Sequence, residues 1–280
     1  MTTQTRRFCY QLSEAPLAPG EVAIVGAGPG DPGLLTLRAL SLLQQAECLV
    51  FDRLVSQLVL DMAPSSAETY YVGKASSCHA LTQEQTNELM VELSRQGKRV
   101  VRLKGGDPFI FGRGGEEAEY LIRHDVAFRV VPGITSASGC STYAGFPLTH
   151  RDHAQSVTFV TGHCKGDSCL ALNWAALAAP HQTVVFYMGL ANASLISQKL
   201  QAHGLSASHP VALVERGTTA AQRQALTTLG ELVATIEREA FKPPTLIVVG
   251  EVVRLADTLA VAQTPRLAAE PEKLLGAVAW

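Results

Sequence analysis

Short, largely apolar runs recur through the first half of the chain, and each is followed within two residues by glycine, proline or aspartate. The runs cover residues 22–25, 48–51, 100–103 and 128–131. Between them, apolar side chains recur at helical spacing, in residues 34–43, 81–95 (after an N-cap at Thr82) and 116–123. Strands that alternate with helices in this way are typical of a parallel sheet covered by helices. The pattern therefore predicts an α/β domain in this half.

The second half has the same alternation with strands of its own. Its apolar runs cover residues 157–160, 183–187, 211–214 and 245–249, with helical spacing in 193–203 and 229–239. We therefore expect a second α/β domain. The predicted organisation is a flexible N-terminal leader at 1–20, an N-terminal α/β domain at 21–135, a C-terminal α/β domain at 136–256 and a tail at 257–280.

Composition narrows the class of protein. The 280 residues are 47% hydrophobic and 17% charged, which allows a sizeable core and excludes global disorder. The net charge of −2 argues against nucleic-acid or polybasic membrane binding. No run approaches the roughly 20 apolar residues that span a bilayer, and we find no signal peptide. We expect a cytoplasmic protein.

The spacing of the cysteines supports the expected cytoplasmic location. The six cysteines are Cys9, Cys48, Cys78, Cys140, Cys164 and Cys169, and no two of them form a C-x-x-C pair. Scattered cysteines without a signal peptide fit reduced thiols. His163 with its neighbouring cysteines matches no zinc spacing, so we predict no metal site.

The first glycine-rich loop, residues 26–31, lies between a predicted strand and a predicted helix. Gly26, Gly28 and the later Asp52 fit a dinucleotide fingerprint, but Asp31 occupies the third glycine position, where it would face a pyrophosphate. Pro29 also lacks the N–H that a phosphate would use. The loop suits a ligand without a phosphate, and a tight turn alone remains the structural alternative.

Three further clusters carry candidate chemistry. Gly105-Gly106-Asp107 follows a strand, where open α/β sheets bind ligands, and suits a neutral polar group such as a ribose or an amine. Arg113 lies between glycines and could bind a carboxylate bidentately, or be a solvated loop arginine. Thr135 and Ser136 either cap a helix or offer hydroxyl and N–H groups to a ligand.

Taken in order, the motifs are specific. They are GAGPGD (26–31), LKGGDPFIFGRGGEE (103–117), VPGITSA (131–137), PLTHR (147–151), TGH (161–163) and YMG (187–189). The chain resembles the uroporphyrinogen-III C-methyltransferases of the tetrapyrrole methylase family, over roughly residues 21–255.

The resemblance implies fold and function together. It implies two α/β domains with the active site in the cleft between them, in a homodimer. It also implies methylation of uroporphyrinogen III by S-adenosyl-L-methionine at C2 and C7, giving precorrin-1 and then precorrin-2. Some members carry a dehydrogenase and ferrochelatase module, for which this chain has no room. Precorrin-2 is thus expected to pass to a downstream precorrin-2-processing enzyme, toward sirohaem, cobalamin or haem d1.

The resemblance also assigns roles residue by residue. The expected cofactor-binding positions are Pro29, Gly105, Gly106, Asp107, Ile110, Thr135, Ser136, Met188, Gly217 and Thr245. The expected substrate-side positions are Arg113, Glu116, Arg151 and Met188. Asp52 and Lys74 match positions proposed as proton acceptor and proton donor. Arginine is a poor base, so we take Arg113 first as a carboxylate clamp, with direct proton transfer left open.

Other functions remain possible on the residues alone. A related methylase would act on a later corrin precursor. A nicotinamide-dependent oxidoreductase would use the Gly26 loop, and a non-catalytic carrier would bind a tetrapyrrole without turnover. Methyl transfer from labelled S-adenosylmethionine separates the three.

Overall fold

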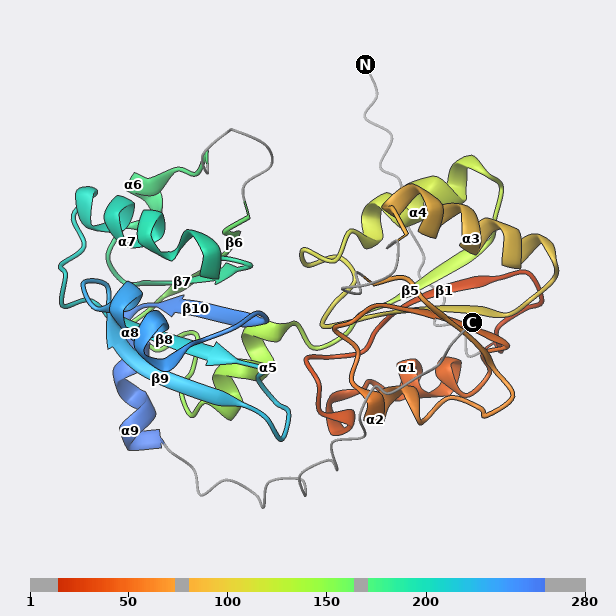
Figure 1. The fold of residues 1–280 in the computed structure, drawn as a ribbon, viewed down its shortest axis with the longest axis horizontal. Helices are drawn as coiled ribbons and strands as arrows, with labels where there is room; N and C mark the ends of the chain where they lie inside the picture. The colour runs from red at the N-terminus through yellow and green to blue at the C-terminus, as the bar shows by residue number, and fades with distance from the viewer. Residues whose placement is uncertain (1–14, 74–80, 164–170, 260–280) are drawn as a thin grey trace, which may run out of the picture.

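The computed structural model describes residues 15–73, 81–163 and 171–259. Two five-stranded sheets form separate lobes (Figure 1), in the strand orders β3-β2-β4-β1-β5 and β6-β7-β10-β8-β9. Two buried clusters draw their members from residues 17–131, and two others from 137–256. The predicted fold class, two α/β units, is confirmed.

The first sheet is parallel throughout, as the alternating pattern predicts. Its strands are β1 (Val22–Gly26), β2 (Cys48–Phe51), β3 (Glu68–Tyr71), β4 (Val100–Lys104) and β5 (Phe128–Val131). Strand β3 is absent from the prediction because its sequence ETYY is largely exposed at the sheet edge and carries no apolar run. The order β4-β1-β5 places the loops after these three strands side by side.

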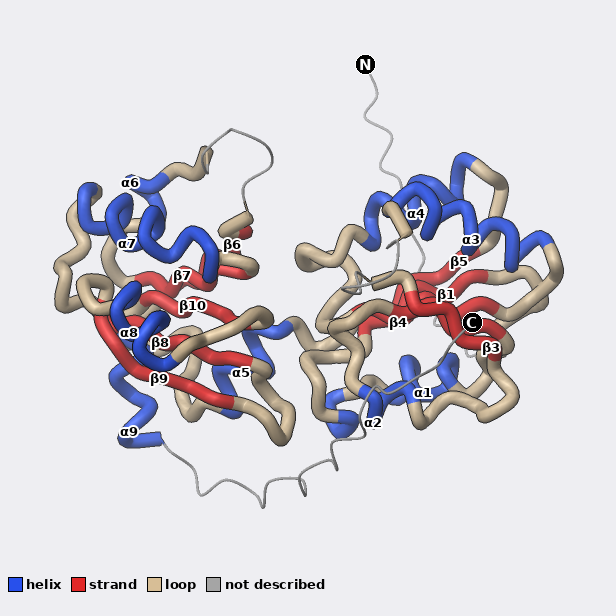
Figure 2. The backbone as a smooth tube through the Cα atoms, in the orientation of Figure 1, coloured by secondary structure: helices blue, strands red, loops and turns tan. Residues whose placement is uncertain are grey.

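Helices cover both faces of this sheet (Figure 2). They are η1 (Pro32–Leu34), α1 (Leu37–Leu43), α2 (Gln57–Leu60), α3 (Gln83–Arg95) and α4 (Gly114–Arg123). Side chains of α1 and α2 pack with Ala23 and Val101, and side chains of α3 and α4 pack with Val22 and Val100. Alternate residues of β4 therefore face opposite helix layers.

Two helix starts show how local chemistry fixes the boundaries. Thr82 and Gln85 form a capping box at α3, as the predicted N-cap requires. The predicted helix at 34–43 instead divides into two, because Asp31 caps the short η1 and Thr36 caps α1.

The second sheet is mixed. Its strands are β6 (Ser156–Thr161), β7 (Gln182–Tyr187), β8 (Pro210–Glu215), β9 (Arg223–Thr228) and β10 (Thr245–Val249). Strand β10 runs antiparallel to β7 and β8, and β9 forms a hairpin partner to β8. Strand β9 is absent from the prediction because its sequence RQALTT is mostly polar and lies at an edge.

The helices of the second half also form two layers. They are α5 (Ser136–Tyr143), α6 (Trp174–Leu177), η2 (Leu190–Asn192), α7 (Ala193–Ala202), α8 (Leu232–Glu239), η3 (Glu251–Leu255) and α9 (Ala256–Leu259). Helices α6, α7 and α8 pack on one face of the sheet, and α5, η3 and α9 on the other. Helix α5 directly follows the first sheet in sequence but packs with the second.

Residues 15–20, part of the segment predicted as a leader, contact the first lobe. Leu17 is 2% exposed within the first lobe, and its backbone N–H donates to Gln45 Oε1 at 2.8 Å. Arg129 donates to the carbonyl oxygens of Ala15 and Pro16. The segment 15–20 is thus held by the first domain. Among the described residues, no helix has both the length and the apolar character needed to cross a membrane.

Candidate active site

Three glycine-containing loops meet at the carboxyl ends of β1, β4 and β5. Gly28 and Gly106 exchange backbone hydrogen bonds of 3.1 and 2.7 Å. A Cβ atom on Gly26 would lie 2.7 Å from Gly106 O, and one on Gly133 would overlap the same oxygen. Any side chain at Gly26 or Gly133 would therefore separate the loops. These glycines have a packing role that the sequence patterns alone do not distinguish from ligand contact.

Asp107 ties two of these loops together. Its Oδ1 accepts from Phe109 N at 2.8 Å, and its Oδ2 accepts from Gly133 N at 3.0 Å. Gly105 packs against Leu54, because an added Cβ would lie 2.6 Å from Leu54 Cβ. Gly106 has φ +70°, and its added Cβ would point toward Ser136, 3.4 Å from Oγ.

Tyr187 joins the start of α5 to the end of β7. Thr135 occupies the N-cap position of α5 but makes no side-chain cap; its Oγ1 lies 2.6 Å from Tyr187 Oη instead. The same phenol accepts from Ala137 N at 2.9 Å. Burial raises the pKa of Tyr187 despite these bonds, so the phenol stays protonated at neutral pH. Tyr187 belongs to the YMG motif of the sequence, but no role is predicted for it, because its sequence position does not distinguish it from a core tyrosine.

Apolar side chains line the edge next to Tyr187. Phe111 contacts the Tyr187 ring, with centroids 4.9 Å apart. Phe109, Ile110 and Met188 are 59%, 37% and 53% exposed, which is unusual for side chains of this size. Exposed apolar side chains therefore lie on loops of both lobes.

The Gly26 loop also reaches the second lobe. Asp31 N donates to Thr218 Oγ1 at 3.2 Å, and the Tyr143 hydroxyl donates to the Asp31 carboxylate. A Cβ on Gly30 would lie 2.6 Å from Thr219 Cγ2. Asp31 thus has partners of its own where a dinucleotide would place a pyrophosphate, which argues against the nicotinamide alternative.

The remaining predicted cofactor positions lie along the same seam. A Cβ on Gly139 of α5 would lie 2.5 Å from Pro29 Cγ, and one on Gly217 would overlap Cys140 of the same helix. Thr245 begins β10 opposite Glu215, and its Oγ1 donates to Lys242 O at 2.6 Å. The predicted set therefore follows the line where α5 and the β8 loop meet the first lobe.

A cavity of about 270 Å³ opens between the lobes on this line. It is lined by Pro29, Gly30, Arg53, Leu54, Val55, Ser56, Arg216, Thr219, Pro243 and Pro244. A larger cavity, about 410 Å³, includes His209 and Glu251. These residues flank the start of β8 and the end of β10, so that cavity lies at the opposite end of the second sheet.

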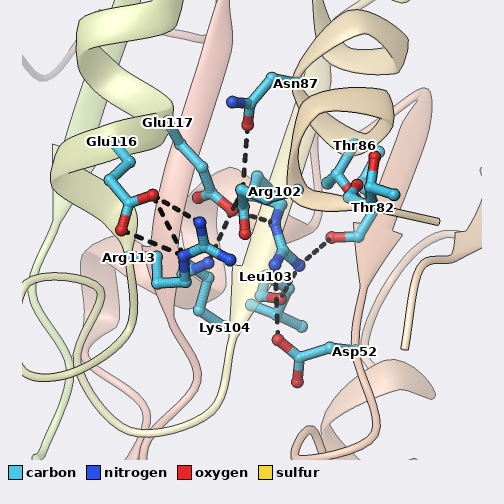
Figure 3. A network of polar contacts seen from close by, with 12 residues as sticks. Asp52, Thr82, Thr86, Asn87, Arg102, Leu103, Lys104, Arg113, Glu116 and Glu117 are labelled. Carbon is cyan, nitrogen blue, oxygen red and sulfur yellow. Dashed lines mark hydrogen bonds and ion pairs between the residues drawn. The ribbon is translucent and has the colours of Figure 1, made fainter. Parts of the chain in front are cut away.

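Arg113 and Glu116 form an exposed pair at the start of α4 (Figure 3). Arg113 has φ +60°, and its Nε and Nη2 donate to Glu116 at 3.0 and 2.6 Å. The side chains are 54% and 56% exposed. The hydrogen bond with Glu116 raises the pKa of Arg113 further above its usual range, so it stays a cation.

The other predicted catalytic and substrate residues lie apart from that pair. Asp52 follows β2, where its Oδ1 accepts from Leu54 N at 3.0 Å and its Oδ2 lies 3.4 Å from Arg102 Nη2. Arg151 is exposed in a turn closed by the His150–Ala154 bridge, and no described bond joins it to another predicted site residue. Lys74 lies outside the described residues.

A buried charged cluster was overlooked in the sequence. Arg102 and Lys104 of β4 contact Glu117 of α4 at 3.0 and 2.7 Å (Figure 3). The available signal was a pair of cations at alternate positions of an otherwise apolar strand. Within residues 15–73, 81–163 and 171–259, no group of three or more metal-ligating side chains gathers.

Comparisons with known proteins place the chain in a family. Residues 21–233 match the model of the tetrapyrrole (corrin/porphyrin) methylases. Siroheme synthase of Azotobacter vinelandii is 60% identical over 246 residues, which are 88% of this chain and 53% of that protein. Siroheme synthase of Stutzerimonas stutzeri shows the same identity and coverage. The chain spans about half the length of these curated relatives.

Solved structures point to the same family. Uroporphyrin III C-methyltransferase of Thermus thermophilus is 39% identical, with a TM-score of 0.72 over 84% of this chain and 94% of that one. The same values hold for its complex with S-adenosylhomocysteine. A cobalt precorrin-4 methyltransferase is 27% identical, with a TM-score of 0.75 over 84% of this chain and 96% of that one. This chain belongs to the tetrapyrrole methylase family.

Proposed function

We propose that this chain transfers methyl groups from S-adenosylmethionine to C2 and C7 of uroporphyrinogen III, giving precorrin-1, then precorrin-2, and S-adenosylhomocysteine. The observation that carries the proposal is that the β1, β4 and β5 loops meet one another, and that Phe111 and Thr135 beside them contact Tyr187 of the second lobe. The likeness to the Thermus thermophilus methyltransferase and its S-adenosylhomocysteine complex supports this choice within the family.

The groups along the seam suit this methyl donor. They are backbone amides, the hydroxyls of Thr135 and Ser136, and the exposed apolar side chains of Ile110 and Met188. The space into which a Gly106 side chain would point lies next to Ser136, so glycine leaves room for a ligand there. Asp31, held by Tyr143, is compatible with a sulfonium-bearing zwitterion and incompatible with a pyrophosphate.

The proposed donor site combines residues of both lobes. It comprises Pro29, Gly105, Gly106, Asp107, Ile110, Thr135, Ser136, Met188, Gly217 and Thr245. When bound, the donor supplies an electrophilic methyl group that an electron-rich pyrrole carbon attacks, so the reaction requires no protein nucleophile. The protein orients the two reactants, which can contribute up to about 7–11 kcal/mol.

Residues of both lobes would hold the substrate, and charged residues of the first lobe would handle its proton. Uroporphyrinogen III carries eight carboxylates, which suit the planar guanidinium of Arg113. We assign Arg113, Glu116, Arg151 and Met188 to the substrate side. Because Arg113 keeps its proton, we assign removal of the ring proton to Asp52, with Lys74 as proton donor. Direct proton transfer by Arg113 is the alternative.

Methyl transfer from labelled S-adenosylmethionine tests the proposal. Uroporphyrinogen III should gain two methyl groups by mass. The structural likeness to a cobalt precorrin-4 methyltransferase favours one competitor, a methylase of a later corrin precursor, which would leave uroporphyrinogen III unchanged. Binding of NAD without methyl transfer would indicate the oxidoreductase, and porphyrinogen binding without turnover would indicate the carrier.

Gly106 of the proposed donor site can be tested against a matched control glycine outside the site, Gly97. Gly106 and Gly97 have φ values of +70° and +78°, but a Cβ on Gly97 meets nothing within 4 Å. Alanine at either position carries a similar backbone strain of about 1–2 kcal/mol. Calorimetry should show weaker S-adenosylhomocysteine binding in Gly106→Ala and unchanged binding in Gly97→Ala. Equal affinities in the two variants would move the donor elsewhere.

Two further proposals concern partners. We propose a homodimer, for which light scattering should give about twice the chain mass of 29.8 kDa. We also propose that precorrin-2 passes to a separate downstream processing enzyme, toward sirohaem, cobalamin or haem d1. Coupled assays with and without such an enzyme would show whether precorrin-2 accumulates when the chain acts alone.

A further inference from the structure

Four charged side chains of the first lobe form a chain of contacts (Figure 3). Arg102 joins Asp52 to Glu117, through Nη2 at 3.4 Å and Nε at 3.0 Å. Its Nη1 donates to Leu103 O at 3.0 Å, so all three guanidinium nitrogens are engaged. Lys104 Nζ donates to Glu117 Oε1 at 2.7 Å. The four residues, called here the Arg102 cluster, contain two cations and two carboxylates.

The Arg102 cluster is buried except at one end. The side chains of Arg102, Lys104 and Glu117 are 4%, 4% and 0% exposed, whereas that of Asp52 is 27% exposed. Burial would raise the pKa of Glu117, but the two neighbouring cations outweigh it and lower the pKa, so the carboxylate is ionised. Its Oε2 has no hydrogen-bond partner among the described residues.

Stability does not explain such a cluster. Desolvating each ion costs several kcal/mol, and hydrophobic residues of similar volume often stabilise a core equally well or better. Val100, on the same face of β4, packs into the apolar layer under α3 and α4, so apolar residues suit this layer. The charges at Arg102 and Lys104 therefore call for a reason other than folding.

The contacts of the Arg102 cluster suggest that reason. At one end Arg102 holds the Asp52 carboxylate, whose other oxygen accepts from Leu54 N. At the other end, Glu117 belongs to the first turn of α4, and its N–H donates to Arg113 O at 3.1 Å. Gln83 of α3 also donates to Glu117. One rigid network thus fixes both Asp52 and the backbone that carries Arg113.

We propose that Arg102 and Glu117 are positioning residues, which set the Asp52 carboxylate and the Arg113 loop relative to each other for methyl transfer. The inference rests on the proposed function, in which those two groups handle the ring proton and a substrate carboxylate. Arg102 and Glu117 touch neither reactant. They act by fixing groups that do, and a buried ionic network does this more rigidly than apolar contacts.

A charge-balanced double variant separates positioning from stability. Glu117→Gln with Lys104→Met removes one charge of each sign and keeps the volumes similar. We expect unfolding close to that of the parent, unchanged S-adenosylhomocysteine affinity and unchanged KM. We expect kcat to fall by about 100-fold, the loss that a displacement of about 1 Å can produce. Glu119→Gln, at an exposed position of the same helix, should keep the parental kcat.

A conservative change gives a second measurement. Lysine cannot make the three contacts of the Arg102 guanidinium at once. Arg102→Lys should therefore keep the charge but lower kcat. Its crystal structure should show a displaced Asp52 carboxylate. That readout does not depend on any reaction.

The outcomes distinguish the two proposals. A folded double variant with parental kcat overturns the positioning role, and so does an Asp52 carboxylate that stays in place in Arg102→Lys. Loss of S-adenosylhomocysteine binding along with kcat also overturns it, because the cluster would then support the donor loop. A parent that transfers no methyl group to uroporphyrinogen III refutes the proposed function, and the Arg102→Lys structure still decides the positioning.

Discussion

Glu116 and Glu117 are neighbours in the first turn of α4, yet their surroundings are opposite. The Glu116 side chain is 56% exposed and pairs with Arg113, which is equally exposed. The Glu117 side chain is 0% exposed and contacts Arg102 and Lys104. A helix turns by about 100° per residue, so consecutive carboxylates face solvent and core respectively.

The difference separates two uses of an ion pair. An exposed pair contributes about 0.2–1 kcal/mol, because water screens it, so Arg113 can exchange Glu116 for a ligand carboxylate at little cost. A buried pair cannot be opened cheaply, because an unpartnered ion would remain in the core. The outer face of α4 is therefore suited to binding, and the inner face to fixing geometry.

The largest effect should follow from removing the buried carboxylate. Glu117→Ala leaves Arg102 and Lys104 without their shared anion, so the free energy of unfolding should fall by about 3–5 kcal/mol. Glu116→Ala should change it by less than about 0.5 kcal/mol. Urea unfolding of both variants measures the difference. Similar losses in the two would abolish the distinction between the faces.

Arg113 should give the next largest effect, on turnover. Arg113→Ala should reduce methyl transfer by about 100-fold, or about 2.7 kcal/mol, because a carboxylate clamp is lost. Arg113→Lys should recover only part of that loss, since lysine keeps the charge without the planar fork. Steady-state rates measure both variants, and S-adenosylhomocysteine affinity should stay near the parental value.

The control for Arg113 lies on the same helix. Arg123 is exposed at the other end of α4, over the Tyr120 ring. Arg123→Ala should leave turnover unchanged. Near-normal turnover in Arg113→Ala would refute the clamp. Loss of donor binding in that variant would mean that Arg113 shapes the donor site instead.

The two faces also differ in how far the sequence predicts them. The parallel first sheet and the main helices follow from apolar periodicity, but the edge strands β3 and β9 do not, because ETYY and RQALTT lack an apolar run. The predicted boundary at residues 135 and 136 stays a prediction. The glycine neighbours of Arg113 mark it in the sequence as a candidate binding residue. Its pairing with Glu116, three positions later, follows from helical spacing.

The contacts on the inner face of α4 could not be predicted from the sequence, for a physical reason. The contacts of Glu117 with Arg102 and Lys104 join residues 13 to 15 positions apart through the packing of α4 on β4. Tyr187 meets Thr135 across 52 positions, from the other lobe. Periodicity reports which residues are buried, whereas these partnerships depend on how layers pack. The roles given to the predicted site residues, Arg113, Asp52 and Lys74 among them, all stay predictions.

Acid should reduce the contribution of the buried Glu117 carboxylate to the free energy of unfolding. Because the pKa of Glu117 is lowered in the folded state, its contribution to stability is present above the unfolded pKa and is lost as pH falls through the folded pKa. Glu117→Gln lacks that contribution at every pH. The gap in unfolding free energy between parent and variant should therefore be widest near neutral pH and narrow in acid. Urea unfolding at several pH values measures the gap, and a constant gap would contradict an ionised Glu117.

The smallest effect should come from the exposed carboxylate itself. Glu116 binds Nε and Nη2 of Arg113, which orients the guanidinium. In Glu116→Gln that hold weakens, and Arg113 must be ordered by the substrate at an entropic cost. We expect KM for uroporphyrinogen III to rise by a few fold, within the roughly 0.2–1 kcal/mol of an exposed pair, with kcat and stability nearly unchanged. Because the pair is exposed, raising the salt concentration should lessen the difference between parent and variant. A lower KM in Glu116→Gln would show that Glu116 competes with the substrate for Arg113, and the outer face would then restrain binding instead of preparing it.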